Sequence, residues 1–99
     1  MSGYSIIVDP AAANQIREAH RYYALRSARA ASAFLDAVDG AMDFVIDQPF
    51  AAAPVKRDLR HMVLKRFPYA VYYRVSGNNV LVIALIHGKR HPREWRRLA

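Results

Sequence analysis

The chain has 99 residues, 54% of them hydrophobic and none of them cysteine. This length and apolar content predict one domain, residues 1–99, with a single hydrophobic core, and they exclude a disordered chain. The absence of cysteine excludes disulfides, thiolate nucleophiles and cysteine-ligated metal centres. The longest apolar run is far below the roughly 20 residues of a membrane span, and no signal peptide is visible. We therefore expect a cytoplasmic protein with no membrane partner.

The net charge of +7 is concentrated in the second half of the sequence. Residues 1–54 hold four arginines and six acidic residues, a net charge of −2. Residues 55–99 hold eleven lysines and arginines and two acidic residues, a net charge of +9. Charge that serves only solubility has no reason to gather in one half. The second half is therefore expected to face nucleic acid or an acidic protein.

The first half predicts a short strand and two helices. Residues 4–8 are apolar and β-branched, and Asp9 then caps a helix whose first position suits Pro10. Two series of apolar residues at helical spacing predict two helices joined around Ser27, and hence an antiparallel hairpin. The inward residues are Ala12, Ile16, Ala19 and Tyr23 in the first helix and Ala31, Phe34, Leu35, Val38, Met42, Val45 and Ile46 in the second. The Ala-rich stretch between Pro49 and Pro54 is expected to be an irregular connection.

The second half predicts three strands, over residues 59–67, 69–75 and 79–87. The Phe67-Pro68 link and the turn over residues 76–79 are short, so these strands must be antiparallel. The unbroken apolar run over residues 80–86 predicts a central strand. In the strand before it, one face is expected to be core (Val71, Tyr73, Val75) and the other partly wet (Ala70, Tyr72, Arg74). The order β-α-α-β-β-β predicts an α+β fold, with a helical hairpin packed on a mostly antiparallel sheet and a short basic C-terminal tail.

Function is expected at the edge where the last strand leads into residues 87–99, which hold two histidines, a tryptophan and five cations. His87 ends a buried strand and is better explained as a structural hydrogen-bonding group than as a catalyst. His87 and His91 would form a metal pair only on a helix, and Gly88 and Pro92 oppose a helix there. We therefore expect no metal and no cofactor.

Two stretches of the second half resemble the RelE/ParE superfamily of toxins. They are residues 66–75, RFPYAVYYRV, and residues 82–92, VIALIHGKRHP. The element order and the length match as well, so the resemblance covers nearly the whole chain. It implies the growth-inhibiting toxin of a type II toxin–antitoxin pair, of the kind involved in plasmid stabilisation, held inactive by an antitoxin whose C-terminal segment wraps across it.

Within this superfamily, RelE-like members cut mRNA on the ribosome, and ParE-like members act on DNA gyrase. Cleavage of RNA needs a group to activate the 2′-hydroxyl, cations for the phosphate and an acid for the leaving oxygen. RelE-like chains place an arginine directly after the tyrosine of the middle strand, where this chain has Ala70. The family arginine of the G-K-R phrase is present as Arg90, but Trp95 and Arg96 stand where the nucleases have an aromatic acid or histidine. The resemblance is therefore closer to the ParE side.

Three hypotheses follow. A gyrase-binding toxin would use the basic tail as its target-binding surface: Lys89, Arg90, Arg93, Trp95, Arg96 and Arg97, with Trp95 as the apolar anchor. An endoribonuclease would use as catalytic residues Arg90, Arg66 and Arg74 on phosphate and His61 or His91 for the proton. A non-toxic member would serve in autoregulation with its antitoxin.

The active hypotheses share a partner, a cognate antitoxin with an acidic C-terminal segment. An amphipathic helix followed by an extended segment is expected to cover the helical hairpin and the sheet edge. The resemblance implies binding to operator DNA only through the complex with the antitoxin. The expected antitoxin contacts are Tyr22, Tyr23, Arg60, Arg66 and Arg74.

Overall fold

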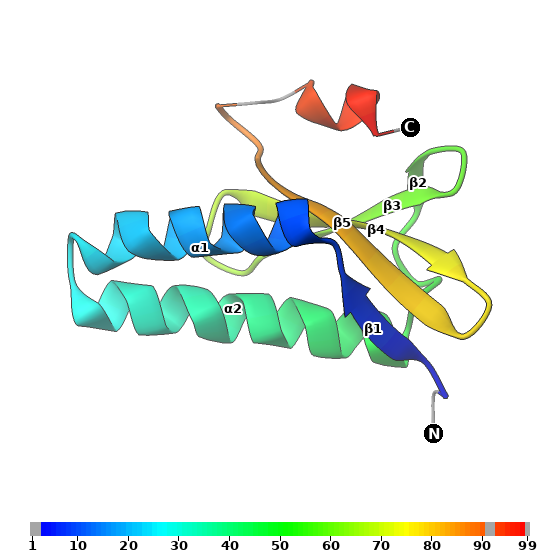
Figure 1. Cartoon of the computed structure of the whole chain (residues 1–99), viewed down its shortest axis with the longest axis horizontal. Coiled ribbons are helices and arrows are strands. Elements are labelled where there is room, and N and C mark those ends of the chain that lie inside the picture. Colours follow the sequence, from blue (N-terminus) through cyan, green and yellow to red (C-terminus); the bar gives the residue numbers. More distant parts are fainter. Residues whose placement is uncertain (1–2, 91–92, 99) are drawn as a thin grey trace.

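The computed structural model of the chain describes residues 3–90 and 93–98. Two helices pack on one side of a five-stranded sheet, and a short 3₁₀ helix lies on the other side (Figure 1). The elements are β1 (Ser5–Val8), α1 (Pro10–Ala24), α2 (Ala28–Asp47), β2 (Pro54–Lys56), β3 (Leu59–Val63), β4 (Tyr69–Ser76), β5 (Asn79–His87) and the 3₁₀ helix η1 (Glu94–Arg97). This arrangement confirms the predicted α+β fold.

The sheet has the strand order β1-β5-β4-β3-β2. The first strand of the chain pairs in parallel with the last, with Ser5 opposite Asn79 and Val8 opposite Val82. All other pairs are antiparallel, so the sheet is mostly antiparallel, as predicted. Since β5 lies between β1 and β4, the apolar run over residues 80–86 occupies an interior strand, which confirms its expected position.

The helical hairpin begins and turns at the residues that the sequence singled out. Asp9 precedes Pro10, the first residue of α1, and its carboxylate accepts a hydrogen bond of 2.9 Å from the N–H of Ala11. Ser27 caps α2 in the same way by accepting from the N–H of Ala30 at 2.9 Å. Each cap satisfies a backbone donor that a helix start leaves unpaired.

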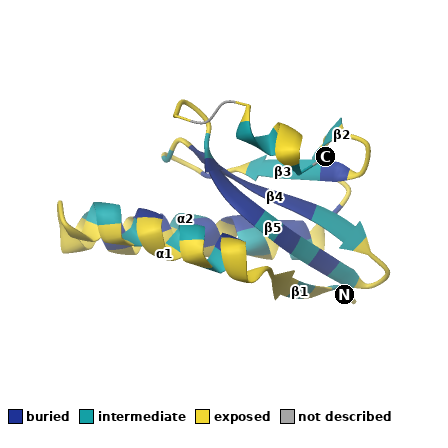
Figure 2. Ribbon diagram, turned by 45° about the horizontal axis from the view of Figure 1, so that its top comes forward, coloured by how far each residue is buried: buried dark blue, intermediate teal, exposed yellow. Residues whose placement is uncertain are grey.

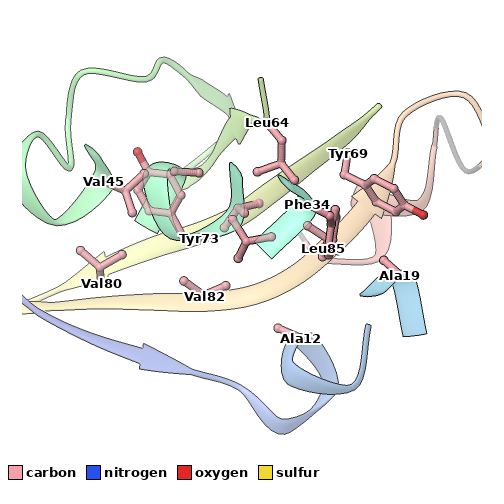
Figure 3. Close-up of a cluster of buried hydrophobic side chains, with 13 residues drawn as sticks. Ala12, Ala19, Phe34, Val45, Leu64, Tyr69, Tyr73, Val80, Val82 and Leu85 are labelled. Carbon is pink, nitrogen blue, oxygen red and sulfur yellow. The ribbon is translucent and has the colours of Figure 1, made fainter. Parts of the chain in front are cut away.

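The main core lies between the two helices and the sheet face beneath them (Figure 3). Phe34 and Val45 of α2 are fully buried in the same cluster as Tyr73 of β4. The hydroxyl of Tyr73 donates a hydrogen bond of 2.9 Å to the carbonyl of Pro49, so its burial leaves no unpaired polar group. The fully buried members with the largest side chains are Tyr73, Phe34, Val45, Val71, Val80 and Val82.

One predicted strand boundary is wrong, and one short strand was not predicted. The strand predicted over residues 59–67 ends at Val63, because Arg66 adopts a left-handed backbone conformation (φ 67°) and the N–H of Leu64 bonds the carbonyl of Tyr69 at 2.9 Å. Together these features close a turn. The stretch after Pro49 contains the three-residue strand β2, which starts at Pro54 and pairs irregularly with β3. Because β2 is an edge strand, proline is tolerated there.

The prediction that the second face of β4 is partly wet is wrong for two of its three residues. Ala70 and Tyr72 are only 7% and 8% exposed. They belong to a small cluster on the sheet face away from α1 and α2, here called the second face. Trp95 and Leu98 of the C-terminal segment pack against this cluster, which explains why β4 and β5 are largely buried on both sides (Figure 2).

Candidate functional site

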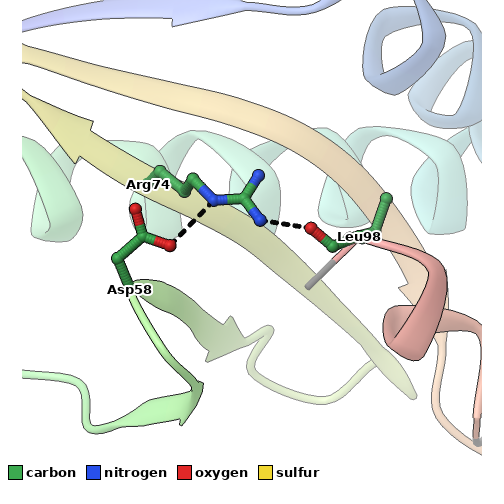
Figure 4. A network of polar contacts seen from close by, with 3 residues as sticks. All are labelled: Asp58, Arg74 and Leu98. Carbon is green, nitrogen blue, oxygen red and sulfur yellow. Dashed lines mark hydrogen bonds and ion pairs between the residues drawn. The ribbon is translucent and has the colours of Figure 1, made fainter.

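The C-terminal segment is docked on the second face of the sheet. The η1 helix places Trp95 and Leu98 against a cluster that contains Leu59, Tyr72 and Ile86. Arg74 of β4 fixes the end of this segment, since its guanidinium donates to the carbonyl of Leu98 and to Asp58 (Figure 4). The distance from Nε of Arg74 to Oδ1 of Asp58 is 3.0 Å.

Docking of the segment leaves its cations on the outside. Arg93, Arg96 and Arg97 are exposed, whereas Trp95 is half-buried beneath them. Arg97 pairs with Glu94 within η1, and the Arg96 guanidinium lies 5.8 Å from the centre of the Trp95 ring. Among the described residues, neither Arg93 nor Arg96 forms an ion pair with an acid. Arg93, Arg96 and Arg97 are therefore exposed cations on a folded segment, whereas Arg90, predicted to act with them, lies at Tyr22 of α1.

The predicted nuclease residues lie in different environments. Arg74 is bound to Asp58 and Leu98, and Arg66 lies exposed in the turn between β3 and β4. His61 faces Tyr72, with 5.4 Å between ring centres, and its Nδ1 is buried without a hydrogen-bond partner among the described residues. Burial lowers the pKa of the His61 imidazole from its ordinary value. His91 lies outside the described residues.

Arg90 lies near the C-terminal end of α1, with its guanidinium 5.1 Å from the centre of the Tyr22 ring. The His87 side chain positions the chain here, because its Nδ1 accepts hydrogen bonds from the N–H groups of Lys89 (3.1 Å) and Arg90 (3.0 Å). This arrangement confirms that His87 has a structural hydrogen-bonding role. A hollow of about 390 Å³ opens between α1 and the end of β5, with Tyr22, Tyr69, His87 and Arg90 in its wall.

The five predicted antitoxin contacts separate into inward and outward residues. Tyr23 stacks on Phe34 and meets Phe67 edge-on at 5.0 Å, so it is mainly a core residue. Burial raises the pKa of the Tyr23 hydroxyl, so it stays protonated at neutral pH. Arg60 donates to the carbonyls of Ala52 and Phe50 and thereby supports the connection before β2. Arg66 is exposed and Tyr22 is half-buried, whereas Arg74 is engaged as described above.

The sequence did not predict an apolar groove of about 500 Å³ between α2 and β3. Its wall includes Phe44 and Val63, which are 42% and 59% exposed, and Gly40, whose lack of a side chain deepens it. Asp36 and Lys65 lie at its sides. Phe44 falls outside the predicted inner face of its helix. The sequence held one signal of this groove, because Phe44 is an aromatic residue on a helical face otherwise lined by aspartates.

Two further properties bear on function. Within residues 3–90 and 93–98, no three His, Asp or Glu side chains gather closely enough to hold a metal ion. No helix in this described part is long and apolar enough to cross a membrane.

Comparison with known proteins identifies the family. A family model described as "ParE toxin of type II toxin-antitoxin system, parDE" matches residues 6–92. A solved structure described as "Chromosomal ParDE TA system from P. aeruginosa" has a similar fold, with a TM-score of 0.64 over 88% of this chain and 98% of that chain, at 18% identity. No curated protein matches the chain significantly. The family match confirms the resemblance inferred from residues 66–75 and 82–92. The chain belongs to the ParE toxins of type II toxin–antitoxin systems.

Proposed function

We propose that this toxin inhibits growth by binding DNA gyrase through its cationic C-terminal segment, and that a cognate antitoxin neutralises it. The surroundings of the predicted nuclease residues favour a binding toxin over a ribonuclease. Arg74 is held by Asp58 and the Leu98 carbonyl, and His61 is enclosed beside Tyr72. Ala70, where the nucleases have an arginine, is buried and uncharged. A phosphate would find few available groups on this face.

The docked tail favours recognition of a macromolecule. Because η1 is held by Arg74 and by the packing of Trp95, its exposed arginines need little further ordering when a partner binds. Arg93 and Arg96 have no acidic partner among the described residues, so both can form ion pairs with an acidic patch on the target. Trp95 is half-buried under the tail, so only its exposed part can contact the target.

The apolar groove between α2 and β3 supports the antitoxin part of the proposal. Phe44 and Val63 expose apolar surface that an amphipathic helix would cover. The similar P. aeruginosa structure is of a toxin–antitoxin system, which agrees with this partner. The +9 charge of residues 55–99 favours an acidic inhibitory segment.

The first test is a supercoiling assay with purified toxin and gyrase, run beside a ribosome-dependent mRNA cleavage assay on the same preparation. We expect blocked supercoiling and intact mRNA. The double variant R93Q/R96Q should inhibit supercoiling at least roughly tenfold less, because a close interfacial charge pair contributes about 1.5 kcal/mol or more. The matched control is Arg29→Gln, an exposed arginine at the start of α2. Cleaved mRNA with normal supercoiling would overturn the proposal in favour of a ribonuclease.

A further inference from the structure

Two arginines from distant parts of the chain meet at one tyrosine. The Arg26 guanidinium lies 4.5 Å from the centre of the Tyr22 ring and donates a hydrogen bond of 2.6 Å to its hydroxyl. The Arg90 guanidinium lies 5.1 Å from the same ring centre. We call Tyr22, Arg26 and Arg90 the tyrosine clamp.

The positive charge of the clamp is not neutralised within the described part of the chain. Neither Arg26 nor Arg90 forms an ion pair there. Both guanidiniums lie within 5.1 Å of one ring centre, so two like charges share one neighbourhood, and an anion bound beside them would reduce their repulsion. Guanidinium groups bind carboxylates and phosphates through paired N–H donors.

The surroundings of the clamp favour a peptide over a nucleic acid. Tyr22 and Arg90 form part of the wall of the 390 Å³ hollow, whose wall also contains Glu18 and Glu94. Glu94 is paired with Arg97, whereas Glu18 has no ion pair among the described residues. Carboxylates in the wall would repel a uniformly anionic polymer, while a peptide can place one acidic side chain beside the arginines and neutral or basic groups near Glu18.

The backbone around the hollow is already fixed. The N–H of Leu85, on the part of β5 beyond its pairing with β1, donates to the Gln15 side chain at 2.9 Å. His87 holds the N–H groups of Lys89 and Arg90, so the Arg90 backbone is ordered before any ligand arrives. A preorganised cation binds an anion at a lower entropic cost.

The geometry points to the tyrosine clamp as the seat of one acidic side chain of the antitoxin, whose carboxylate is bound by both Arg26 and Arg90. This inference rests on the proposed function and adds a specific site to it. Arg90 also belongs to the predicted target-binding surface. An antitoxin seated in the clamp therefore occupies a cation that the target requires, and the two partners exclude each other at this residue.

The test uses the full-length toxin and its cognate antitoxin, identified by rescue of growth. Antitoxin affinity is measured by calorimetry for wild-type toxin and for Arg26→Gln, Arg90→Gln and the control Arg29→Gln. We expect at least roughly tenfold weaker binding for each clamp variant and no change for the control. Tyr22→Phe, which keeps the ring and removes the acceptor of Arg26, should weaken binding less than Arg26→Gln does.

A double-mutant cycle locates the carboxylate. Each Asp and Glu of the antitoxin's inhibitory segment is changed to its amide and combined with Arg90→Gln. One position should show losses that are not additive with the toxin variant. Equal affinity of wild-type toxin and both clamp variants would overturn this inference and leave the proposed function standing. Failure of wild-type toxin to bind any antitoxin would instead remove the proposed function.

A nucleic-acid ligand is tested with the same proteins. A single-stranded 20-nucleotide RNA is titrated against wild-type toxin and the clamp variants. RNA binding that disappears in Arg26→Gln and Arg90→Gln, with antitoxin affinity unchanged, would overturn the peptide assignment. No clamp-dependent RNA binding is the result expected.

Discussion

The two faces of the sheet differ in what covers them and in how that cover is held. The helices cover the first face over a large, continuous core with Phe34, Val45 and Tyr73 at its centre. The second face carries a small cluster beneath a four-residue 3₁₀ helix, tied down by Arg74. Packing therefore sets the stability of the fold on one face, and a few polar contacts set the position of the cationic surface on the other.

The largest expected effect comes from a cavity on the first face. Phe34→Ala should reduce the free energy of unfolding by about 3–5 kcal/mol, because it removes a fully buried ring amid Tyr23, Phe67 and Tyr69. Urea denaturation followed by circular dichroism measures the loss. The neighbouring Leu35, 37% exposed on the same helix, is the control, and Leu35→Ala should lose clearly less. Similar losses for both would mean that the first face is not the main source of stability.

A smaller effect is expected from releasing the cover of the second face. Arg74→Met keeps the aliphatic stem but removes the bonds to Leu98 and Asp58, and it should cost about 1 kcal/mol of stability, since Arg74 is partly exposed. Trp95 is the sole tryptophan, so a red shift of its fluorescence in native buffer reports detachment directly. In Asp58→Asn, which leaves the Leu98 bond intact, the shift should be slight. An unchanged spectrum in Arg74→Met would show that packing alone holds the tail.

The smallest effect is a pH dependence that arises on the second face. Burial lowers the pKa of His61 in the folded protein, so below its ordinary pKa of about 6.5 the unfolded chain binds more protons than the folded one. Stability should therefore fall as the pH drops from about 7.5 to 5.5, with a His61 contribution of about 1 kcal/mol or less.

Urea denaturation of wild-type protein and His61→Phe at both pH values isolates this contribution. The variant should lose less stability on acidification than the wild type. Tyr72→Phe keeps the ring beside His61 and should retain the wild-type slope. If His61→Phe loses as much stability on acidification as the wild type, the second face contributes no pH sensitivity.

The first face was largely predictable from the sequence, because its signals are local. Helical spacing placed Phe34 and Val45 inward, and Asp9 and Ser27 marked helix starts that the structure confirms. Short links predicted antiparallel strands correctly. The early end of β3 at Val63 was missed because it depends on the left-handed backbone of Arg66, a conformation that arginine seldom adopts.

The second face was predictable only in part, because its contacts join residues far apart in the sequence. Spacing could not indicate that Leu98 would reach Arg74, or that Trp95 would cover Tyr72. The sequence predicted the basic tail as a binding surface. That its residues bind gyrase stays a prediction. The contact between Tyr22 and Arg90 could not be predicted either, since the sequence suggested Tyr22 as an antitoxin contact and Arg90 as a target contact.

The parallel pairing of β1 with β5 has a consequence for when the sheet can form during synthesis. Ser5 precedes its partner Asn79 by 79 − 5 = 74 positions, so it leaves the ribosome well before Asn79 does. Contacts of such long sequence separation form late in folding. The sheet therefore cannot close before residues 79–82 have been synthesised, and the tail cannot dock on β4 before Leu98 has been synthesised. A nascent chain that stops before these residues therefore lacks the docked cationic segment on which the proposed binding to gyrase depends.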